Sequence, residues 1–98
     1  MFNPTINLEL DHLNTGAFNL YDGPRKLGTM QLNIDDGKLM IFHTEVDPDS
    51  RGKGYARQLF DAMVAYAREH ELKVVPLCPY VRKQFKKSPD EYNDIRKK

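Results

Sequence analysis

The chain has 98 residues, with 15 Lys and Arg against 14 Asp and Glu, a formal net charge of +1 at neutral pH, and one cysteine. A chain of this length builds one small core, so we expect residues 1–98 to form a single domain. The balanced charge argues against nucleic acid or an anionic membrane surface as the partner.

The cysteine count and the hydropathy pattern indicate the compartment. One cysteine cannot form an internal disulfide, which favours a reducing environment. No apolar run approaches the roughly 20 residues that a membrane-spanning helix needs. The start of the sequence lacks the basic and apolar regions of a signal peptide. We therefore expect a soluble, cytoplasmic protein.

Four strands are predicted in the first half of the chain. Apolar and polar residues alternate over residues 6–10, and further strand-like runs follow at 17–21, 27–34 and 38–46. Turn residues separate these runs, and Asp35-Asp36-Gly37 is a strong hairpin signal before the last of them. That last strand begins with a run that is apolar on both faces, which predicts a central place in the sheet.

The period changes to that of a helix after Gly54. Apolar residues at positions 56, 59, 60, 63, 64 and 67 predict an amphipathic helix from about residue 52 or 53 to about residue 69. Residues 73–77 then predict a short strand, parallel to 38–46 through a right-handed crossover, and Pro76 predicts that the pairing breaks there.

Short helices are predicted at the C-terminal end. Pro79 suits the first turn of a helix that continues over residues 80–87, and a last short helix is predicted to end near residue 95. The elements together predict a mixed α/β (α+β) fold, with a mostly antiparallel sheet, then a right-handed βαβ unit and short C-terminal helices.

Two glycines, Gly52 and Gly54, stand between the fourth strand and the long helix. Glycine has no side chain to block a ligand, and the first turn of a helix offers unpaired N–H groups and the positive end of the helix dipole. A pyrophosphate is the ligand that suits such a turn best. An ordinary strand-to-helix connection is the alternative that the glycine spacing alone leaves open.

Residues 51–56 read R-x-x-G-x-A, which resembles the acetyl-coenzyme A pyrophosphate loop of GCN5-related N-acetyltransferases. The dinucleotide fingerprint fits worse, because its third glycine and its later acidic residue are absent, and the P-loop ending is missing. The segments H-T-E-V at 43–46 and P-L-C-P at 76–79 narrow the resemblance to a very small subfamily. The resemblance covers roughly residues 16 to 95. The sequence departs from the subfamily pattern at Glu71, where the subfamily more often has a glycine that closes the helix.

The resemblance implies acetyl-coenzyme A (acetyl-CoA) as the donor. The loop backbone would bind the pyrophosphate, with two basic side chains adding charge; the loop residues are Arg51, Gly52, Lys53, Gly54, Tyr55 and Ala56. In the family's fold the two parallel strands splay apart, and the pantetheine arm bonds to the exposed backbone of the first. The equivalent cofactor-binding residues here are Thr44 and Val46.

Three residues are candidates for the chemistry. His43 and Glu45 are two apart on one strand, so they face the same side, and either could accept the amine proton. Cys78 precedes a predicted helix, where a thiolate is favoured, and the resemblance places it near the sulfur of the cofactor. A hydrogen-bonded structural histidine and a small buried cysteine are the alternatives for His43 and Cys78. No metal site is predicted, since no histidine or cysteine pair has ligand spacing.

The resemblance implies an acyltransferase that moves an acetyl group from acetyl-CoA to an amine. Full-size members carry helices after the first strand that wall the acceptor side, and the short connections of this chain leave no room for them. An open acceptor side favours a protein or peptide amine. A non-catalytic acyl-CoA-binding or interaction module is the alternative function.

Overall fold

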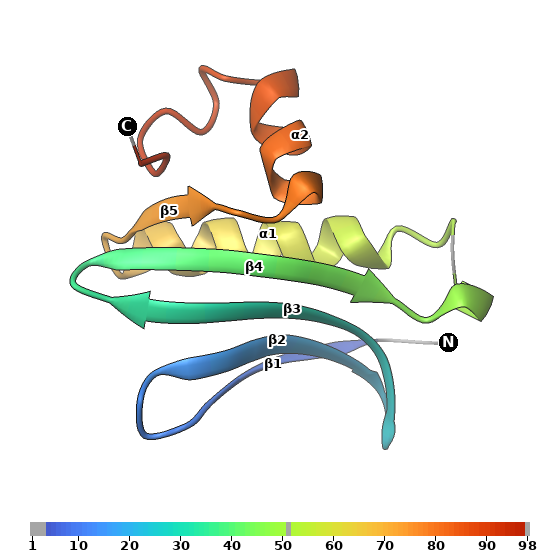
Figure 1. Ribbon diagram of the computed structural model, residues 1–98. Helices are drawn as coiled ribbons and strands as arrows, with labels where there is room; N and C mark the ends of the chain where they lie inside the picture. The colour runs from blue at the N-terminus through green and yellow to red at the C-terminus, as the bar shows by residue number, and fades with distance from the viewer. Residues whose placement is uncertain (1–3, 51, 98) are drawn as a thin grey trace.

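The structure is a computed structural model that describes residues 4–50 and 52–97. Within these ranges five strands form one sheet in the order of the chain, as Figure 1 shows. The first four pair antiparallel and the fifth pairs parallel to the fourth, which confirms the predicted mixed fold. The strands are β1 (Thr5–Leu10), β2 (Thr15–Asp22), β3 (Arg25–Asp35), β4 (Lys38–Val46) and β5 (Lys73–Pro76).

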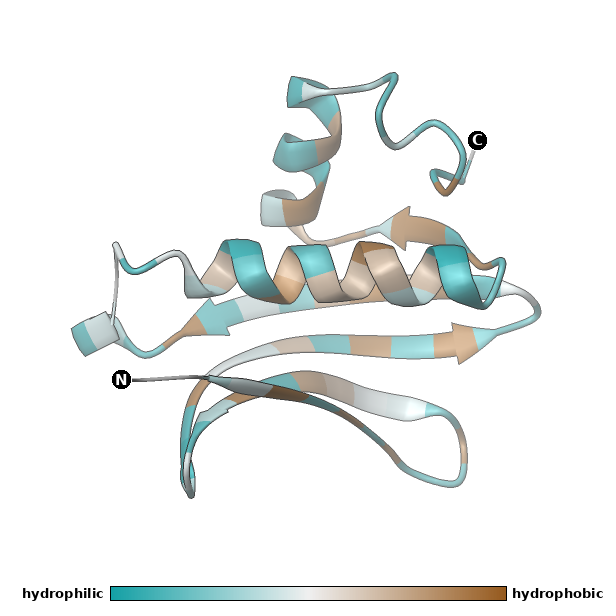
Figure 2. Cartoon of the chain, turned by 180° about the vertical axis from the view of Figure 1, so that it is seen from behind, coloured by the Kyte–Doolittle hydropathy of each residue, from teal (hydrophilic) through white to brown (hydrophobic). Residues whose placement is uncertain are grey.

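Helix α1 (Tyr55–Glu69) lies across one face of this sheet and connects β4 to β5 (Figure 1). Hydrophilic and hydrophobic residues alternate along it in Figure 2, and five of the six predicted apolar positions are buried: Leu59, Phe60, Met63, Val64 and Ala67. The sixth, Ala56, is half-buried at the helix start. A 3-10 turn, Pro48–Ser50, precedes the helix.

The predicted start of α1 was two or three residues too early. Gly54 has a φ of 78° and stands directly before the first helical residue. A residue in this left-handed region cannot continue a right-handed helix, so α1 begins at Tyr55. The glycine turn is therefore outside the helix and flanks its N-terminus.

β4 carries an extra residue that changes which way its last side chains face. Gln31 of β3 is opposite His43, whereas the next residue, Leu32, is opposite Ile41, so Phe42 is the additional residue of a β-bulge. Phe42 is 42% exposed. Because side chains alternate along a strand, one added residue reverses the facing of every residue after it.

The bulge places Thr44 and Val46 on the α1 side of the sheet. Thr44 is opposite Met30, which is fully buried in the core, and both Thr44 and Val46 are half-buried. His43 and Glu45 are exposed and lie on the other side, which we call the outer face. The prediction that His43 and Glu45 share one side is confirmed.

Helix α2 (Pro79–Lys87) forms as predicted, but the last short helix does not. Residues 88–95 make turns, and the chain then runs along the free edge of β5. The Val74 N–H donates to the Ile95 carbonyl at 2.6 Å, and the Lys97 N–H donates to the Val74 carbonyl at 2.9 Å. Of the helices in the described ranges, none is long and apolar enough to cross a membrane.

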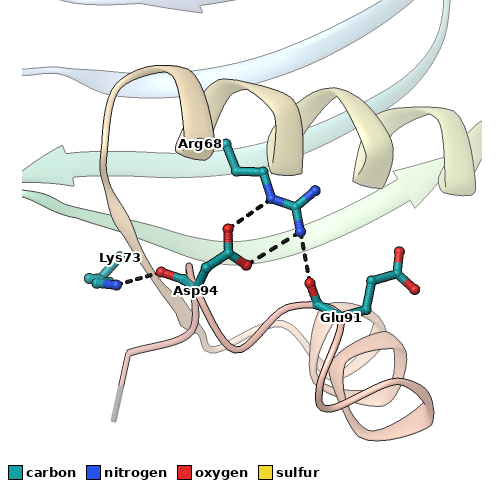
Figure 3. Close-up of polar contacts among 4 residues, drawn as sticks. All are labelled: Arg68, Lys73, Glu91 and Asp94. Carbon is teal, nitrogen blue, oxygen red and sulfur yellow. Dashed lines mark hydrogen bonds and ion pairs between the residues drawn. The ribbon is translucent and has the colours of Figure 1, made fainter.

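Side-chain contacts hold this C-terminal segment on the body of the protein (Figure 3). The Arg68 guanidinium of α1 donates to both carboxylate oxygens of Asp94, at 3.0 and 3.3 Å, and to the Glu91 carbonyl at 2.8 Å. Lys73 donates to the Asp94 carbonyl, and Tyr92 is buried. These tertiary contacts override the local helix preference of the segment.

Glu71→Gly is expected to raise the free energy of unfolding by about 1 kcal/mol. Glu71 follows α1 with a φ of 53°, and an L-residue in this conformation costs roughly 1–2 kcal/mol that glycine avoids. Thermal unfolding should show an increase of about 4–8 °C in Tm. Ala65→Gly, at an exposed position inside α1, is the control and should lower stability by about 1 kcal/mol. Shifts of the same sign in both variants would contradict the strain at Glu71.

Candidate functional site

β4 and β5 separate after a short stretch of pairing. They pair only from Lys38 to Ile41 of β4, and the N–H groups of Leu77 and Cys78 both donate to the Ile41 carbonyl, at 3.0 and 2.9 Å. In the part of the chain that the structure describes, no strand pairs with this edge of β4 over residues 43–46. The predicted break in pairing near Pro76 is confirmed.

Two cavities lie along this free edge and meet at the start of α1. The first, of about 320 Å³, is lined by the end of β4 together with Pro48, Ala56 and Tyr80. The second, also about 320 Å³, extends over the first residues of α1 and the glycine turn before it. Val46, Ala56 and Tyr80 line both cavities. They therefore form one continuous groove, which we call the β4–α1 groove.

The glycine turn at one end of the groove has the features of an anion site. Gly54 caps α1 without a side-chain hydrogen bond, and the first turn of α1 has no acidic residue. At Gly52 and Gly54 an added Cβ would meet no atom within 4 Å, so the space over the backbone is open. Helix N-terminal amides and the positive end of the dipole face an anion bound there. Lys53 beside them is exposed.

The other predicted loop residues contribute in different ways. Tyr55, the first residue of α1, is buried in the core and also lines the second cavity. Ala56 lines both cavities, where its small side chain keeps the groove open. Arg51 lies outside the described residues, so its predicted contact with the pyrophosphate stays a prediction.

The three predicted catalytic residues do not share one side of the sheet. Cys78 is 2% exposed and packs in the core at the start of α2, with its Sγ 3.3 Å from the Thr44 Oγ1. His43 and Glu45 lie on the outer face, although both line the first cavity of the groove. Cys78 is not part of that lining among the described residues. β4 thus stands between the thiol and the two candidate bases.

Tyr80 is a site residue that the sequence reasoning missed. It lines both cavities of the groove, and its ring packs edge-to-face on Phe60 with centroids 6.4 Å apart. Burial raises the pKa of the Tyr80 phenol, against the opposing charge of Arg57. The phenol is protonated at neutral pH, as an ordinary tyrosine is, and its hydroxyl is a hydrogen-bond donor. The sequence feature that could have identified Tyr80 is its position in the first turn of α2, two residues after Cys78.

The groove combines three features that suit a thioester with a long polar arm. An anion site stands at one end, an unpaired strand edge runs along the middle, and a protonated phenol lies where the two cavities meet. Within the described residues, no three side chains of His, Cys, Asp or Glu gather closely enough to hold a metal ion. The arrangement suits binding of a phosphorylated ligand and proton transfer beside it.

Comparison with known proteins identifies the family. A crystal structure of ribosomal-protein-alanine N-acetyltransferase from Brucella melitensis biovar Abortus 2308 matches with a TM-score of 0.62 at 23% identity. The match covers 90% of this chain and 64% of that one, so this chain spans less than two thirds of that protein. No curated protein sequence matches significantly. The family model described as GCN5-related N-acetyl-transferase matches residues 17–95, and the chain therefore belongs to that family.

Proposed function

We propose that this protein is an N-acetyltransferase that binds acetyl-CoA in the β4–α1 groove. The observation that carries the proposal is the continuity of the groove, because an unpaired strand edge leads directly to a glycine-flanked helix N-terminus. The helix start would hold the pyrophosphate, with charge from Lys53 and Arg51. The backbone at Thr44 and Val46 would bond to the pantetheine arm, laid along β4 like an added strand.

The proposed chemistry needs a held donor, a proton acceptor and a proton donor. When bound, acetyl-CoA supplies the acetyl group as a thioester. His43 or Glu45 would take the proton that the amine nitrogen loses as it bonds to the acetyl carbon. Tyr80 would give a proton to the departing sulfur. Cys78, directly behind Thr44, is the second candidate for that donor or for a transient acetyl acceptor.

A protein or peptide amine is the proposed acceptor. Phe60 of α1 packs on Tyr80 and Phe85 of α2, so both helices lie on the same side of the sheet. In the described chain no helix covers the outer face, which leaves an open approach to His43 and Glu45 (Figure 1). The similar structure is named as an acetyltransferase for ribosomal-protein alanine, an acceptor of this class. The unpaired Cys78 fits a reducing compartment, and we propose a cytoplasmic location.

A non-catalytic acyl-CoA-binding module is the second candidate function. The separation of Cys78 from His43 and Glu45 across β4 favours it, because these groups do not converge on one point. Incubation with acetyl-CoA and a panel of peptides with free N-termini, followed by mass spectrometry, distinguishes the two functions. Cofactor binding without any acetylated product would identify the module.

Acetyl-CoA is expected to stabilise the fold by about 2.7 kcal/mol at a hundredfold excess over its dissociation constant. Desulfo-coenzyme A should stabilise it similarly, since the glycine turn binds the pyrophosphate. Pantetheine, which lacks the pyrophosphate, should have a much smaller effect at the same concentration. Thermal unfolding measures all three ligands. An unchanged Tm at millimolar acetyl-CoA would contradict the proposed binding site.

A further inference from the structure

A polar cluster lies on the outer face at β1 and β2, away from the β4–α1 groove. Glu9 of β1 accepts two hydrogen bonds on one oxygen, Oε1, from the Asn19 Nδ2 at 2.5 Å and from the Tyr21 hydroxyl at 2.6 Å. These bonds, that of Tyr21 most strongly, lower the pKa of the Glu9 carboxyl. The carboxylate is therefore ionised at neutral pH.

Asn19 carries a buried acceptor without a partner. The residue is 8% exposed, and its Oδ1 has no hydrogen-bond partner among the described residues. The Asn19 Nδ2 is held by Glu9, so turning the amide over would set two oxygens against each other. A buried polar group left unsatisfied costs about 1–3 kcal/mol, and such groups in native proteins call for an explanation. Because Oδ1 has almost no exposed surface, a ligand can satisfy it only if the Asn19 side chain shifts toward that ligand.

The space beside the Asn19 side chain is large enough for a side chain of a ligand. A cavity of about 360 Å³ opens on the outer face, and Glu9, Asn19, Lys26 and Thr29 are among the residues that line it. The groups at the cluster with remaining capacity, the Glu9 carboxylate and the Asn19 Oδ1, are acceptors. Lys26 is the cation at the rim; its charge also lowers the pKa of the Glu9 carboxyl, so a ligand cation binds there in competition with Lys26, which donates no hydrogen bond to Oδ1. The cluster therefore suits an ammonium or guanidinium group.

The strand register aligns this cluster with the candidate bases of the groove. Asn19 is opposite Thr29, and Thr29 is opposite Glu45; the neighbouring row runs in the same way from Glu9 to His43. With strands about 4.8 Å apart, Asn19 lies about 10 Å from Glu45 and Glu9 lies about 14 Å from His43. Each row therefore runs across the outer face, perpendicular to the strands, and ends at β4.

A third cavity connects the two ends of these rows. It has a volume of about 270 Å³ and shares Lys26 and Thr29 with the outer-face cavity. It also shares Glu45, Val46 and Pro48 with the first cavity of the β4–α1 groove. The three cavities thus adjoin one another, through shared lining residues, from the transfer site to the Glu9 cluster.

We propose that the acceptor is an extended peptide with a Lys or Arg side chain a few residues from its acetylated α-amine, and that Glu9 and Asn19 bind that side chain. An extended chain spans about 3.3–3.6 Å per residue, so a separation of about 10–14 Å corresponds to three or four residues. The proposal rests on the proposed acetyltransferase function and adds its substrate class.

The test compares two peptides that differ in one charge. Both have a free N-terminus, and position 4 is arginine in one and its neutral analogue citrulline in the other. Calorimetry on protein saturated with desulfo-coenzyme A measures binding without turnover, and acetyl-CoA assays give kcat/KM. The wild type should prefer the arginine peptide about tenfold in both measurements, the scale of one charge-assisted hydrogen bond.

Glu9→Gln is the variant that isolates the cluster. Glutamine keeps an oxygen that can accept from Asn19 and Tyr21, and it removes the charge, so the preference for arginine should disappear. Glu69→Gln, at an exposed position at the end of α1, is the control and should keep the preference. Placing arginine at successive positions from 2 to 8 should give an optimum near position 4 or 5, the distance that the register sets.

The outcomes separate this proposal from the proposed function. Equal binding of the two peptides, no binding of either, or a preference that survives Glu9→Gln would overturn the Glu9 site. A preference in binding that Glu9→Gln removes would support the site even if no peptide is acetylated. Failure of turnover in that case would count against the acetyltransferase function alone.

Discussion

Gly54→Asp is expected to weaken acetyl-CoA binding about a hundredfold or more while the protein stays folded. Aspartate tolerates the left-handed conformation that Gly54 adopts, at a φ of 78°. A carboxylate at this end of α1 also interacts favourably with the helix dipole. The same carboxylate would stand where the pyrophosphate binds, and like charges 4 Å apart repel by roughly 4 kcal/mol at an effective dielectric constant of 20. Titration calorimetry measures the affinity.

Gly37→Asp is the matched control for this variant. Gly37 has a φ of 73°, and an added Cβ meets no atom within 4 Å there or at Gly54. Gly37 lies in the turn between β3 and β4, outside the residues that line the groove. Both variants should keep a Tm close to that of the wild type, and only Gly54→Asp should lose the cofactor. Equal affinities in the two folded variants would make the glycine turn an ordinary connection.

The sheet was predictable because its signals are local. Ile6, Leu8 and Leu10 alternate with polar residues, and each is half-buried in the structure. Asp36 and Gly37 both have positive φ, 51° and 73°, as the tight hairpin turn between β3 and β4 requires. Such patterns depend on near neighbours in the sequence, and a single sequence carries them in full.

The facing of the site residues could be predicted only in part. His43 and Glu45 both follow the bulge at Phe42, so the bulge does not change the fact that they face the same side. Which side they face depends on the one extra residue, and pairing with β3 decides its place. The apolar run that contains Phe42 gives no sign of it. For this reason the sequence could not predict that β4 separates Cys78 from His43 and Glu45.

The C-terminal segment shows a long-range requirement that local signals miss. Ser88 and Glu91 have the spacing of a capping box, which favours a helix. The outer edge of β5 leaves the N–H and carbonyl of Val74 without partners from β4, and buried backbone groups need hydrogen bonds. Ile95 and Lys97 supply them. The hydrogen bonds to the Val74 backbone therefore stabilise this segment more than a short helix would.

Tyr80→Phe is expected to lower the rate of acetyl transfer about a hundredfold or more, with little change in acetyl-CoA affinity. Phenylalanine keeps the edge-to-face packing on Phe60 and removes only the hydroxyl. The Tyr80 hydroxyl is protonated at neutral pH, and from its place in the groove it would give that proton to the departing sulfur. Loss of such a general acid typically costs about 10²–10⁴-fold. Single-turnover assays measure the rate, and calorimetry with desulfo-coenzyme A measures binding.

Cys78→Ala, made in parallel, tests the predicted catalytic role of the thiol. The Cys78 Sγ is buried behind Thr44, 3.3 Å from its Oγ1, and Tyr80 rather than Cys78 lines the groove. We therefore expect a much smaller loss of transfer than in Tyr80→Phe, and a loss of about 1 kcal/mol in stability because the Thr44 hydroxyl loses its partner. The intact mass of wild type incubated with acetyl-CoA shows whether Cys78 becomes acetylated. An acetylated Cys78, with a hundredfold loss in Cys78→Ala and a normal rate in Tyr80→Phe, would reverse the assignment and make the thiol the reacting group.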